Sequence, residues 1–244
     1  MINKEIIIKS LNDAIVKCGQ RLRLSNLVHE TFNRFASTIR KRKTEKAILV
    51  NDDGEILKSK NGYKDGVNIA NEVLKAYADN GNQPIHIDHN HPNVFEDDAP
   101  SFLSIPDMDW VIAQHPDTGS FLVKSICCED SYNHSRMTLV RGDNYSVKDK
   151  KSFDKAKNYL WNDVGIETLL LHFSTTKRNF EKLWTDIPNK PKVNSKEYEK
   201  LMSDTRIKAN NMSLEEEGFF KEFSKAQELF RKANCKLNFE WVED

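Results

Sequence analysis

The segment Ile85–Pro92, with the sequence IHIDHNHP, constrains the fold of this chain more than any other stretch. Its isoleucines alternate with polar residues, which is the period-two pattern of a β-strand with one apolar face. The closing proline favours the end of a strand, because proline cannot donate a hydrogen bond to a sheet. On such a strand His89 and His91 lie on one face, so both imidazoles can reach a single metal ion. The stretch therefore predicts a strand that ends in a metal site.

A third ligand is available a little further along the chain. A catalytic zinc ion takes three protein ligands and leaves its fourth position to water. The segment SIPD predicts the start of a short helix, with Ser104 as the N-cap and proline in the first turn. If this helix doubles back, it brings Asp107 to the two histidines. The alternatives for the third ligand are Asp109, Asp97 and Asp98.

Strand-like and helical segments alternate over the first 145 or so residues. Helical spacing runs from about residue 4 to 41, and a hairpin with the turn NDDG follows. A helix over residues 63–81 precedes the histidine-bearing strand. Two further strands are predicted around residues 119–128 and 135–142. This order predicts a mixed α/β fold with a central sheet.

The remainder of the chain is polar and mostly helical. Ser213 and Glu216 have the spacing of a capping box, which predicts that a helix begins there. Alternating apolar residues near the C-terminus predict a last strand. We therefore expect a helical region over residues 1–42, an α/β core over 43–148, and a mostly helical region over 149–244 that packs on the core or extends it.

The composition narrows the classes of function. Lys plus Arg and Asp plus Glu both number 37, so no overall field attracts nucleic acid or a membrane surface. No apolar run is long enough to span a bilayer, and we see no secretory signal. The four cysteines form no CxxC pair, which argues against a zinc ribbon and favours buried thiols in a reducing compartment. We expect a cytoplasmic protein.

The combination HNHP followed by SIPD resembles the signature of the JAMM, or MPN+ (JAB-type), zinc metallopeptidases, especially their bacterial and phage branch. That signature is HxHP, a spacer, then SxxD, with a glutamate on an earlier strand. The resemblance covers roughly residues 43–142. It implies a three-layer core like that of the cytidine deaminases, with a central β-sheet. The helical N- and C-terminal extensions lie outside it.

The resemblance also implies a set of roles. His89, His91 and Asp107 would bind Zn²⁺, and Ser104 would help to hold the developing oxyanion. Glu45 would activate the zinc-bound water as general base, with Glu55 as the alternative. The implied activity is cleavage of a peptide or isopeptide bond in a protein substrate, such as a ubiquitin-like one. The spacer between His91 and Ser104 is longer than in the family's common form, which puts the reach of Asp107 in question.

Two other functions stay open. The string DHNH also resembles the core of HNH endonucleases, but the chain lacks their cysteine frame, and the acids at 96–98 would repel a DNA phosphate. Alternatively, the core is a catalytically silent JAMM-like module. Its helical flanks would then dock into a larger protein assembly, which for a phage-encoded chain includes the virion. Neither nucleic acid nor a membrane is the partner that we expect.

Overall fold

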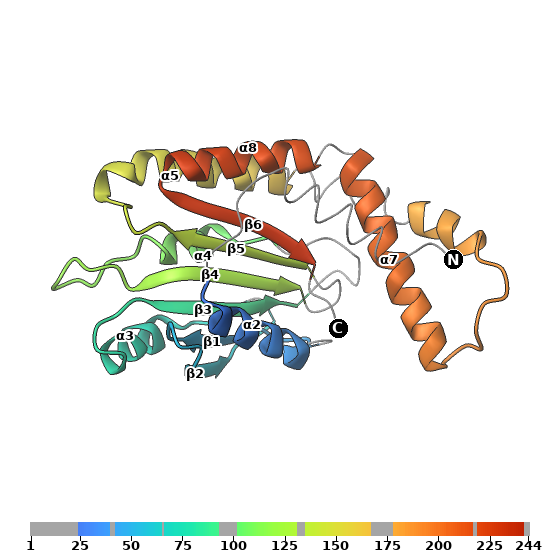
Figure 1. Cartoon of the computed structure of the whole chain (residues 1–244), viewed down its shortest axis with the longest axis horizontal. Coiled ribbons are helices and arrows are strands. Elements are labelled where there is room, and N and C mark those ends of the chain that lie inside the picture. The colour runs from blue at the N-terminus through green and yellow to red at the C-terminus, as the bar shows by residue number, and fades with distance from the viewer. Residues whose placement is uncertain are drawn as a thin grey trace.

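The computed structural model describes residues 24–39, 42–64, 66–92, 102–130, 135–166, 178–216 and 219–241 (Figure 1). The helix predicted before residue 24, Cys18, and the candidate acids Asp97 and Asp98 lie outside these ranges. The three predicted zinc ligands, Ser104 and both candidate glutamates lie within them.

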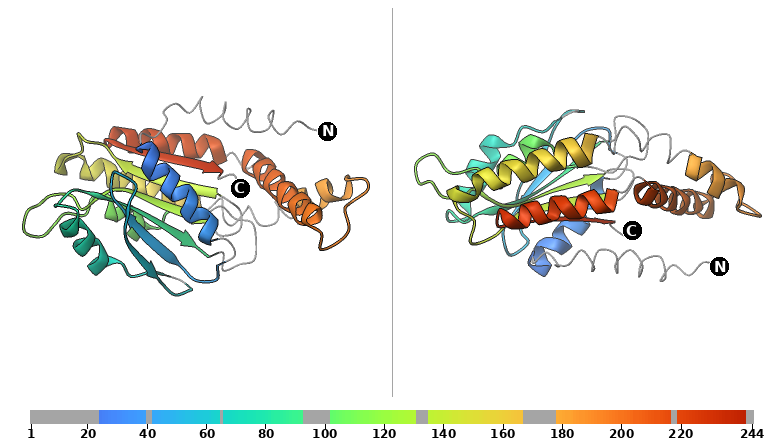
Figure 2. Two further views of the ribbon diagram at one scale, coloured as in Figure 1. Left: turned by 60° about the horizontal axis from the view of Figure 1, so that its bottom comes forward. Right: turned by 90° about the horizontal axis from the view of Figure 1, so that it is seen from above.

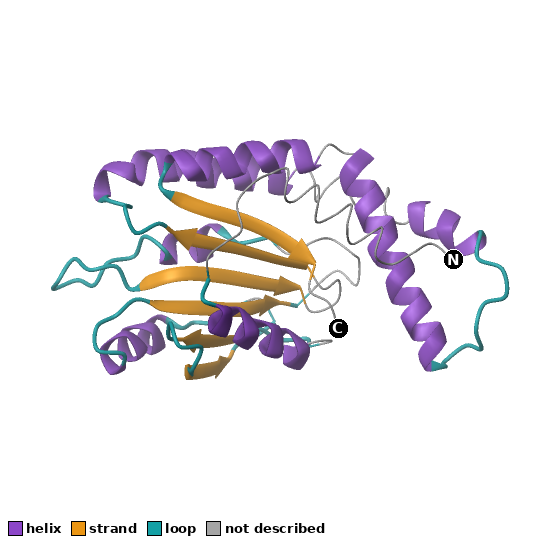
Figure 3. Cartoon of the chain, viewed as in Figure 1, coloured by secondary structure: helices purple, strands orange, loops and turns teal. Residues whose placement is uncertain are grey.

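Six strands form one sheet in the order β2-β1-β3-β4-β5-β6 (Figure 3). Their bounds are β1 Lys46–Val50, β2 Ile56–Asn61, β3 Ile85–His91, β4 Val123–Asp130, β5 Ser135–Arg141 and β6 Cys235–Trp241. The pair β3–β4 is parallel, whereas every other neighbouring pair is antiparallel. The predicted mixed α/β class, both predicted hairpins and the last strand are confirmed. A mixed sheet with helices on both faces needs strands that are buried on both sides, and all seven residues of β5 are buried.

Helix α2 (Asn26–Ile39) covers one face of the sheet. Val28, Phe32, Phe35 and Ile39 repeat at helical spacing, and this apolar face packs against a small cluster on β1 and β4. Gly54, in the β1–β2 turn, supports this contact, because its carbonyl oxygen accepts a hydrogen bond from the Thr31 hydroxyl at 2.7 Å. The turn of the first hairpin thereby fixes the position of α2.

The larger core lies on the other face of the sheet, beneath several helices. The right-hand view of Figure 2 shows α2 on one side of the sheet and α3, α4 and α5 on the other. These helices are α3 Ala70–Asp79, α4 Ile105–Trp110, α5 Lys150–Tyr159 and α8 Phe219–Lys232. Phe153 of α5 meets Phe230 of α8 edge to face, with 5.6 Å between the ring centroids. The C-terminal part of the chain thus contributes both a strand and two covering helices.

Helix α7 (Lys196–Glu216) and the helix over residues 178–185 lie beyond one end of the sheet (Figures 1 and 2). The predicted helix start at Ser213 is wrong, because Ser213 lies inside α7. Its hydroxyl donates to the Ala209 carbonyl at 2.9 Å, one turn earlier. Buried Asn179 donates to the same hydroxyl at 3.0 Å, so Ser213 joins two helices and does not cap one. A local capping pattern was overridden here by a tertiary contact.

Among the described residues, no helix has both the length and the apolar character needed to cross a membrane. Cys127, Cys128 and Cys235 are all buried and form no disulfide within the described ranges, as the sequence predicted for its cysteines. Cys127 belongs to the cluster under α2, whereas Cys128 belongs to the larger core. The adjacent pair therefore points to opposite faces of β4.

Candidate metal centre

Strand β3 places the two histidines at the edge of the larger core. Ile85, Ile87 and His89 alternate on the face that carries this core, and the strand lies between antiparallel β1 and parallel β4. His89 is almost fully buried, whereas His91, next to the strand end, keeps 28% of its side-chain surface exposed. Their Nε2 atoms approach to 3.1 Å. The site is thus enclosed on the side of His89 and open on the side of His91.

Helix α4 delivers the carboxylate. Ser104 is its N-cap in a capping box with Asp107, and Pro106 lies in the first turn, as predicted. Asp107 Oδ2 accepts hydrogen bonds from the Ser104 backbone nitrogen at 2.7 Å and from the Ser104 hydroxyl at 2.6 Å. The capping box therefore fixes the carboxylate while α4 packs against the sheet through buried Met108.

The three predicted zinc ligands converge on one point. Asp107 Oδ1 lies 3.3 Å from His89 Nε2, and Asp107 Oδ2 lies 3.5 Å from His91 Nε2. Zinc bonds to nitrogen and oxygen of about 2.0–2.1 Å place two ligands of a tetrahedral ion about 3.3–3.4 Å apart. The observed separations of 3.1–3.5 Å bracket that value. Despite the long spacer before Ser104, Asp107 lies within reach of a metal held by both histidines.

The pKa shifts within the triad of His89, His91 and Asp107 favour an ionised carboxylate, which is the form that binds a cation. Burial opposes the ionisation of Asp107, but the adjacent His89 and His91 outweigh it and hold the pKa of this carboxyl well below its usual range. Burial likewise disfavours the charged form of His89, yet the Asp107 carboxylate raises its pKa. The carboxylate is therefore ionised at neutral pH, as metal binding requires.

Glu45 lies beside this triad, immediately before β1. The antiparallel register pairs Ala47 with His89, so continuing it by two residues places Glu45 opposite His91 on the same face. Glu45 is buried, and burial raises the pKa of its carboxyl above the usual range, although the charges of His91 and His89 act in the other direction. A carboxyl with a raised pKa next to a metal site has the character of a general base.

The rival acids lie elsewhere. Glu55 is at the opposite end of the first hairpin, where its carboxylate accepts a hydrogen bond from Asn51 Nδ2 at 3.1 Å. Asp109 forms an ion pair with Lys157 of α5, at 2.5 Å. Both acids are thus engaged away from the histidines, and Glu45 and Asp107 are the carboxylates that the fold brings to the site.

One residue near the site was missed from the sequence. The register of β3 and β4 pairs His89 with Cys128, and the ligand atoms of His89, His91 and Cys128 all lie within 4.8 Å of one another. The chain offered no spacing signal for this cysteine, because its proximity depends on the parallel pairing of two strands that are far apart in sequence. Cys128 is therefore a rival to Asp107 for the third ligand position.

The other described histidines have structural partners. His86 points to the α2 face, where Nδ1 lies 2.7 Å from Ser125 Oγ and Nε2 lies 2.8 Å from Asp52 Oδ1. This trio has the residue types of a catalytic triad, but Ser125 is fully buried while 76% of the Asp52 side chain is exposed. A nucleophile that no substrate can reach does not act as one. His115 stacks on Tyr77.

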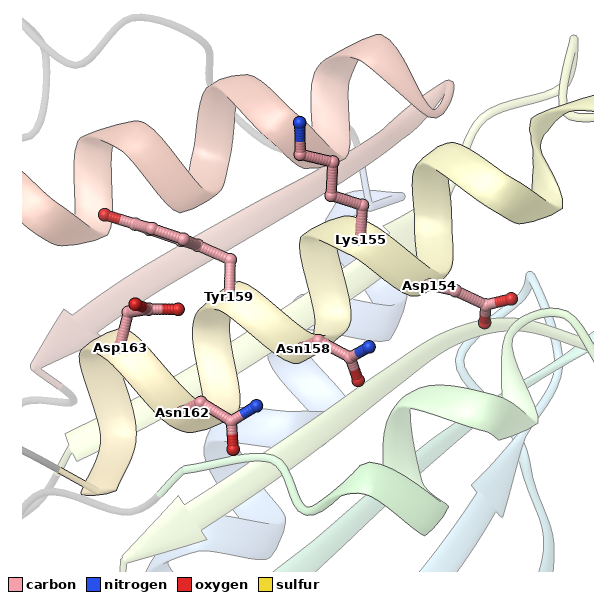
Figure 4. A pocket seen from close by; sticks show the side chains of 6 residues that line it. All are labelled: Asp154, Lys155, Asn158, Tyr159, Asn162 and Asp163. Carbon is pink, nitrogen blue, oxygen red and sulfur yellow. The ribbon is translucent and has the colours of Figure 1, made fainter.

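A surface hollow of about 480 Å³ runs along α5 and the helical turns that follow it (Figure 4). Its lining residues are Asp154, Lys155, Asn158, Tyr159, Asn162 and Asp163. All six come from one helical segment, and none is among the residues of the candidate metal centre. The hollow is therefore separate from the candidate metal centre.

No family model, no curated protein and no solved structure matches this chain.

Proposed function

We propose that this protein is a zinc-dependent hydrolase with a JAMM-like core that cleaves a peptide or isopeptide bond in a protein substrate. The observation that carries the proposal is the convergence of His89, His91 and Asp107 at 3.1–3.5 Å, with buried Glu45 beside them. Two imidazoles and one carboxylate are a typical donor set of catalytic zinc, which leaves a fourth position open. The partly exposed His91 provides that opening.

Each residue has a defined part in this proposal. A bound zinc ion would polarise the attacking water and the scissile carbonyl. Glu45 accepts the proton of the attacking water and passes it to the leaving amine, for which a raised pKa is suited. Ser104 holds Asp107 in place through the capping box. Its contribution to binding the oxyanion stays a prediction.

The placement of Asp88 favours this hydrolase over the endonuclease alternative. In the endonuclease reading, the first histidine of DHNH activates water and the residues that flank it hold the divalent ion, so Asp88 and His89 would face one site. Asp88 and His89 are neighbours on β3, however, so their side chains point to opposite faces of the sheet. His89 lies near Asp107 on one face, whereas Asp88 lies near Cys127 and Glu129 on the other.

Metal analysis combined with a cleavage assay tests the proposal. We expect the double variant His89→Ala/His91→Ala to lose about one equivalent of zinc relative to the unchanged protein. We also expect cleavage of a ubiquitin-like isopeptide or linear fusion that stops when a chelator removes zinc. Zinc content that the double variant leaves unaltered would contradict the site.

Two further outcomes identify the alternatives. Zinc bound at this site without turnover of any ubiquitin-like or peptide substrate would favour the silent assembly module. Magnesium-dependent cleavage of duplex DNA that is lost in His89→Ala but retained in Glu45→Gln would favour the endonuclease.

A further inference from the structure

Two cationic side chains lie next to each other at one end of the sheet. The antiparallel register pairs Ser125 of β4 with Val140 of β5. Continued by one residue, it places Lys124 opposite Arg141, on the face that carries the larger core. The candidate metal ligands lie at the other end, because β3 and β4 run parallel and both begin here. Like charges directly opposite each other on neighbouring strands destabilise a sheet, so this pair needs a compensating negative charge.

Arg141 has no anionic partner in the described part of the chain. Only 6% of its surface is exposed, and its Nε atom is buried without a hydrogen bond. The ionisable groups whose charges would favour its protonated form are Cys235 and Tyr145. Burial raises the pKa of both to about 12, so neither is charged at neutral pH, whereas a guanidinium stays protonated. The fold therefore encloses a positive charge that it does not neutralise.

Aromatic rings hold this guanidinium in place without accepting its hydrogen bonds. The Arg141 Cζ atom lies 4.2 Å from the centroid of the Phe121 ring, a cation–π contact. Tyr145 meets the same ring edge to face, with 5.4 Å between the centroids. An arginine that is fixed by an aromatic ring and has N–H groups to donate is suited to bind a carboxylate or a phosphate.

Lys124 can supply the second positive charge. Its ammonium contacts the carboxylate of Asp143, but 84% of that side chain is exposed, and an ion pair with so exposed an acid contributes little. Burial, followed by the charge of Arg141, lowers the pKa of Lys124. An anion bound between the two cations would remove their repulsion and would contact both.

A surface hollow of about 340 Å³ lies beside the same aromatic rings. Its lining includes Phe121, Tyr145 and Ile112. The hollow also contains Lys150 and Lys157, and both are paired with carboxylates of α4 or α5. The hollow therefore adds apolar and aromatic surface next to Arg141, and its volume suits a small organic molecule.

We propose that Arg141 and Lys124 bind the anionic group of a small organic phosphate or carboxylate, whose apolar part lies against Phe121 and Tyr145. The buried guanidinium without an anionic partner is the observation that carries this proposal. Because Arg141 pairs with Cys235 at the start of β6, a bound anion stabilises the junction between β5 and the C-terminal strand. The site is independent of the proposed metal centre, which lies at the other end of the sheet.

Thermal unfolding of the full chain with phenyl phosphate or benzoate tests the proposal, with chloride added to keep the ionic strength constant. A ligand that binds only the native state raises the Tm as its concentration increases. We expect this rise with at least one of the two compounds, and the more effective compound identifies the class of anion. No rise with either compound would overturn the proposal.

Variants locate the binding site, and isothermal titration calorimetry measures their affinities. Arg141→Met and Lys124→Met should each weaken binding about 10–100-fold, since each removes a hydrogen bond to a charged group. Arg141→Met removes an unpaired buried charge, so it should fold without ligand. Lys124 is only partly buried, so Lys124→Met tests the same site with less effect on the core.

Lys150→Met is the matched control. Lys150 lines the hollow but is already paired with Asp154, so this variant should bind the ligand as the unchanged protein does. Unaltered affinity in Arg141→Met or in Lys124→Met would overturn the proposal, and so would an equal loss of affinity in Lys150→Met.

Discussion

The carboxylate of Asp107 has two sets of partners, the N-cap residue of its own helix and the two histidines of β3. Oδ2 accepts both hydrogen bonds from Ser104, whereas Oδ1 is the oxygen nearer to His89. The capping box thus orients the carboxylate through α4 before any ion binds. A ligand that is fixed in advance loses little entropy on binding, which favours a site of defined geometry.

At this site, Asp107 and Cys128 can be distinguished as third ligands. We expect Asp107→Asn to weaken zinc binding by about 100-fold or more. Loss of a residue that only orients a ligand costs about 10–100-fold, and loss of the ligand itself should cost no less. Cys128→Ser should bind zinc as the unchanged protein does. Competition with a chromophoric chelator measures both affinities. The opposite pattern would assign the third ligand to the thiol.

The general base is the second prediction at the residue scale. Glu45→Gln keeps the shape of the side chain but cannot accept the proton, so turnover should fall about 10²–10⁴-fold while the zinc content stays the same. Glu55→Gln is the matched control, since Glu55 lies at the far end of the same hairpin. Equal activity of the two variants would exclude Glu45 from the mechanism.

Among the elements, the first hairpin and α2 depend on each other through one turn. Gly54 has a φ of +79°, and a Cβ atom built there would lie 2.6 Å from the backbone oxygen of Leu27. Only glycine accommodates both the left-handed conformation and this close approach. The turn thus sets the distance between α2 and the sheet, and with it the cover over Asp88.

Gly54→Ala should therefore lower the free energy of unfolding by about 1–3 kcal/mol. Gly66→Ala is the control, because no atom lies within 4 Å of a Cβ there and its backbone is not in the left-handed region. It should be neutral or stabilise slightly. Urea unfolding of both variants measures the difference, and equal stabilities would contradict the role of the turn.

On the scale of the whole molecule, the C-terminal region completes the sheet. β6 pairs with β5 along its full length, from Ser135–Trp241 to Arg141–Cys235, and α8 packs over it. Without β6, the buried strand β5 would become an exposed edge with an apolar face, which invites aggregation. The sheet therefore combines five strands from residues 46–141 with one strand, β6, from residues 235–241.

A fragment that ends at residue 148 should consequently not fold cooperatively. It would retain the candidate zinc ligands but lose β6, α5 and α8. Circular dichroism during thermal unfolding measures this, with the full chain as the control. A sharp unfolding transition in the fragment would show that residues 149–244 are dispensable for the core.

With a chelator present to remove bound metal, the free energy of unfolding should also decrease at alkaline pH, because the Cys235 thiol is buried. Burial raises the pKa of this thiol to about 12, from an ordinary value of 9.0. Between these values the native state keeps a proton that the unfolded chain has lost, so stability decreases as pH rises from about 9 towards 12. The loss at pH 10 should be roughly 1–1.5 kcal/mol. Cys235→Ser, compared by urea unfolding at pH 8 and 10, should lack this part of the decrease.

The sequence by itself determined the features that depend on local periodicity and capping. Alternation placed His89 and His91 on one face of a strand, and the serine and proline of SIPD positioned the start of α4. These features follow from backbone geometry within a few residues. The same local logic was wrong at Ser213, where a contact with Asn179 decided the outcome.

Only the tertiary structure decided which distant residues meet. The choice of Glu45 over Glu55 depends on the register of β1 against β3, and the nearness of Cys128 to His89 on the pairing of β3 with β4. That same pairing brings Asp88, Cys127 and Glu129 together beneath α2. Strand pairing is set by hydrogen bonds and packing between segments far apart in the chain, so no local pattern records it.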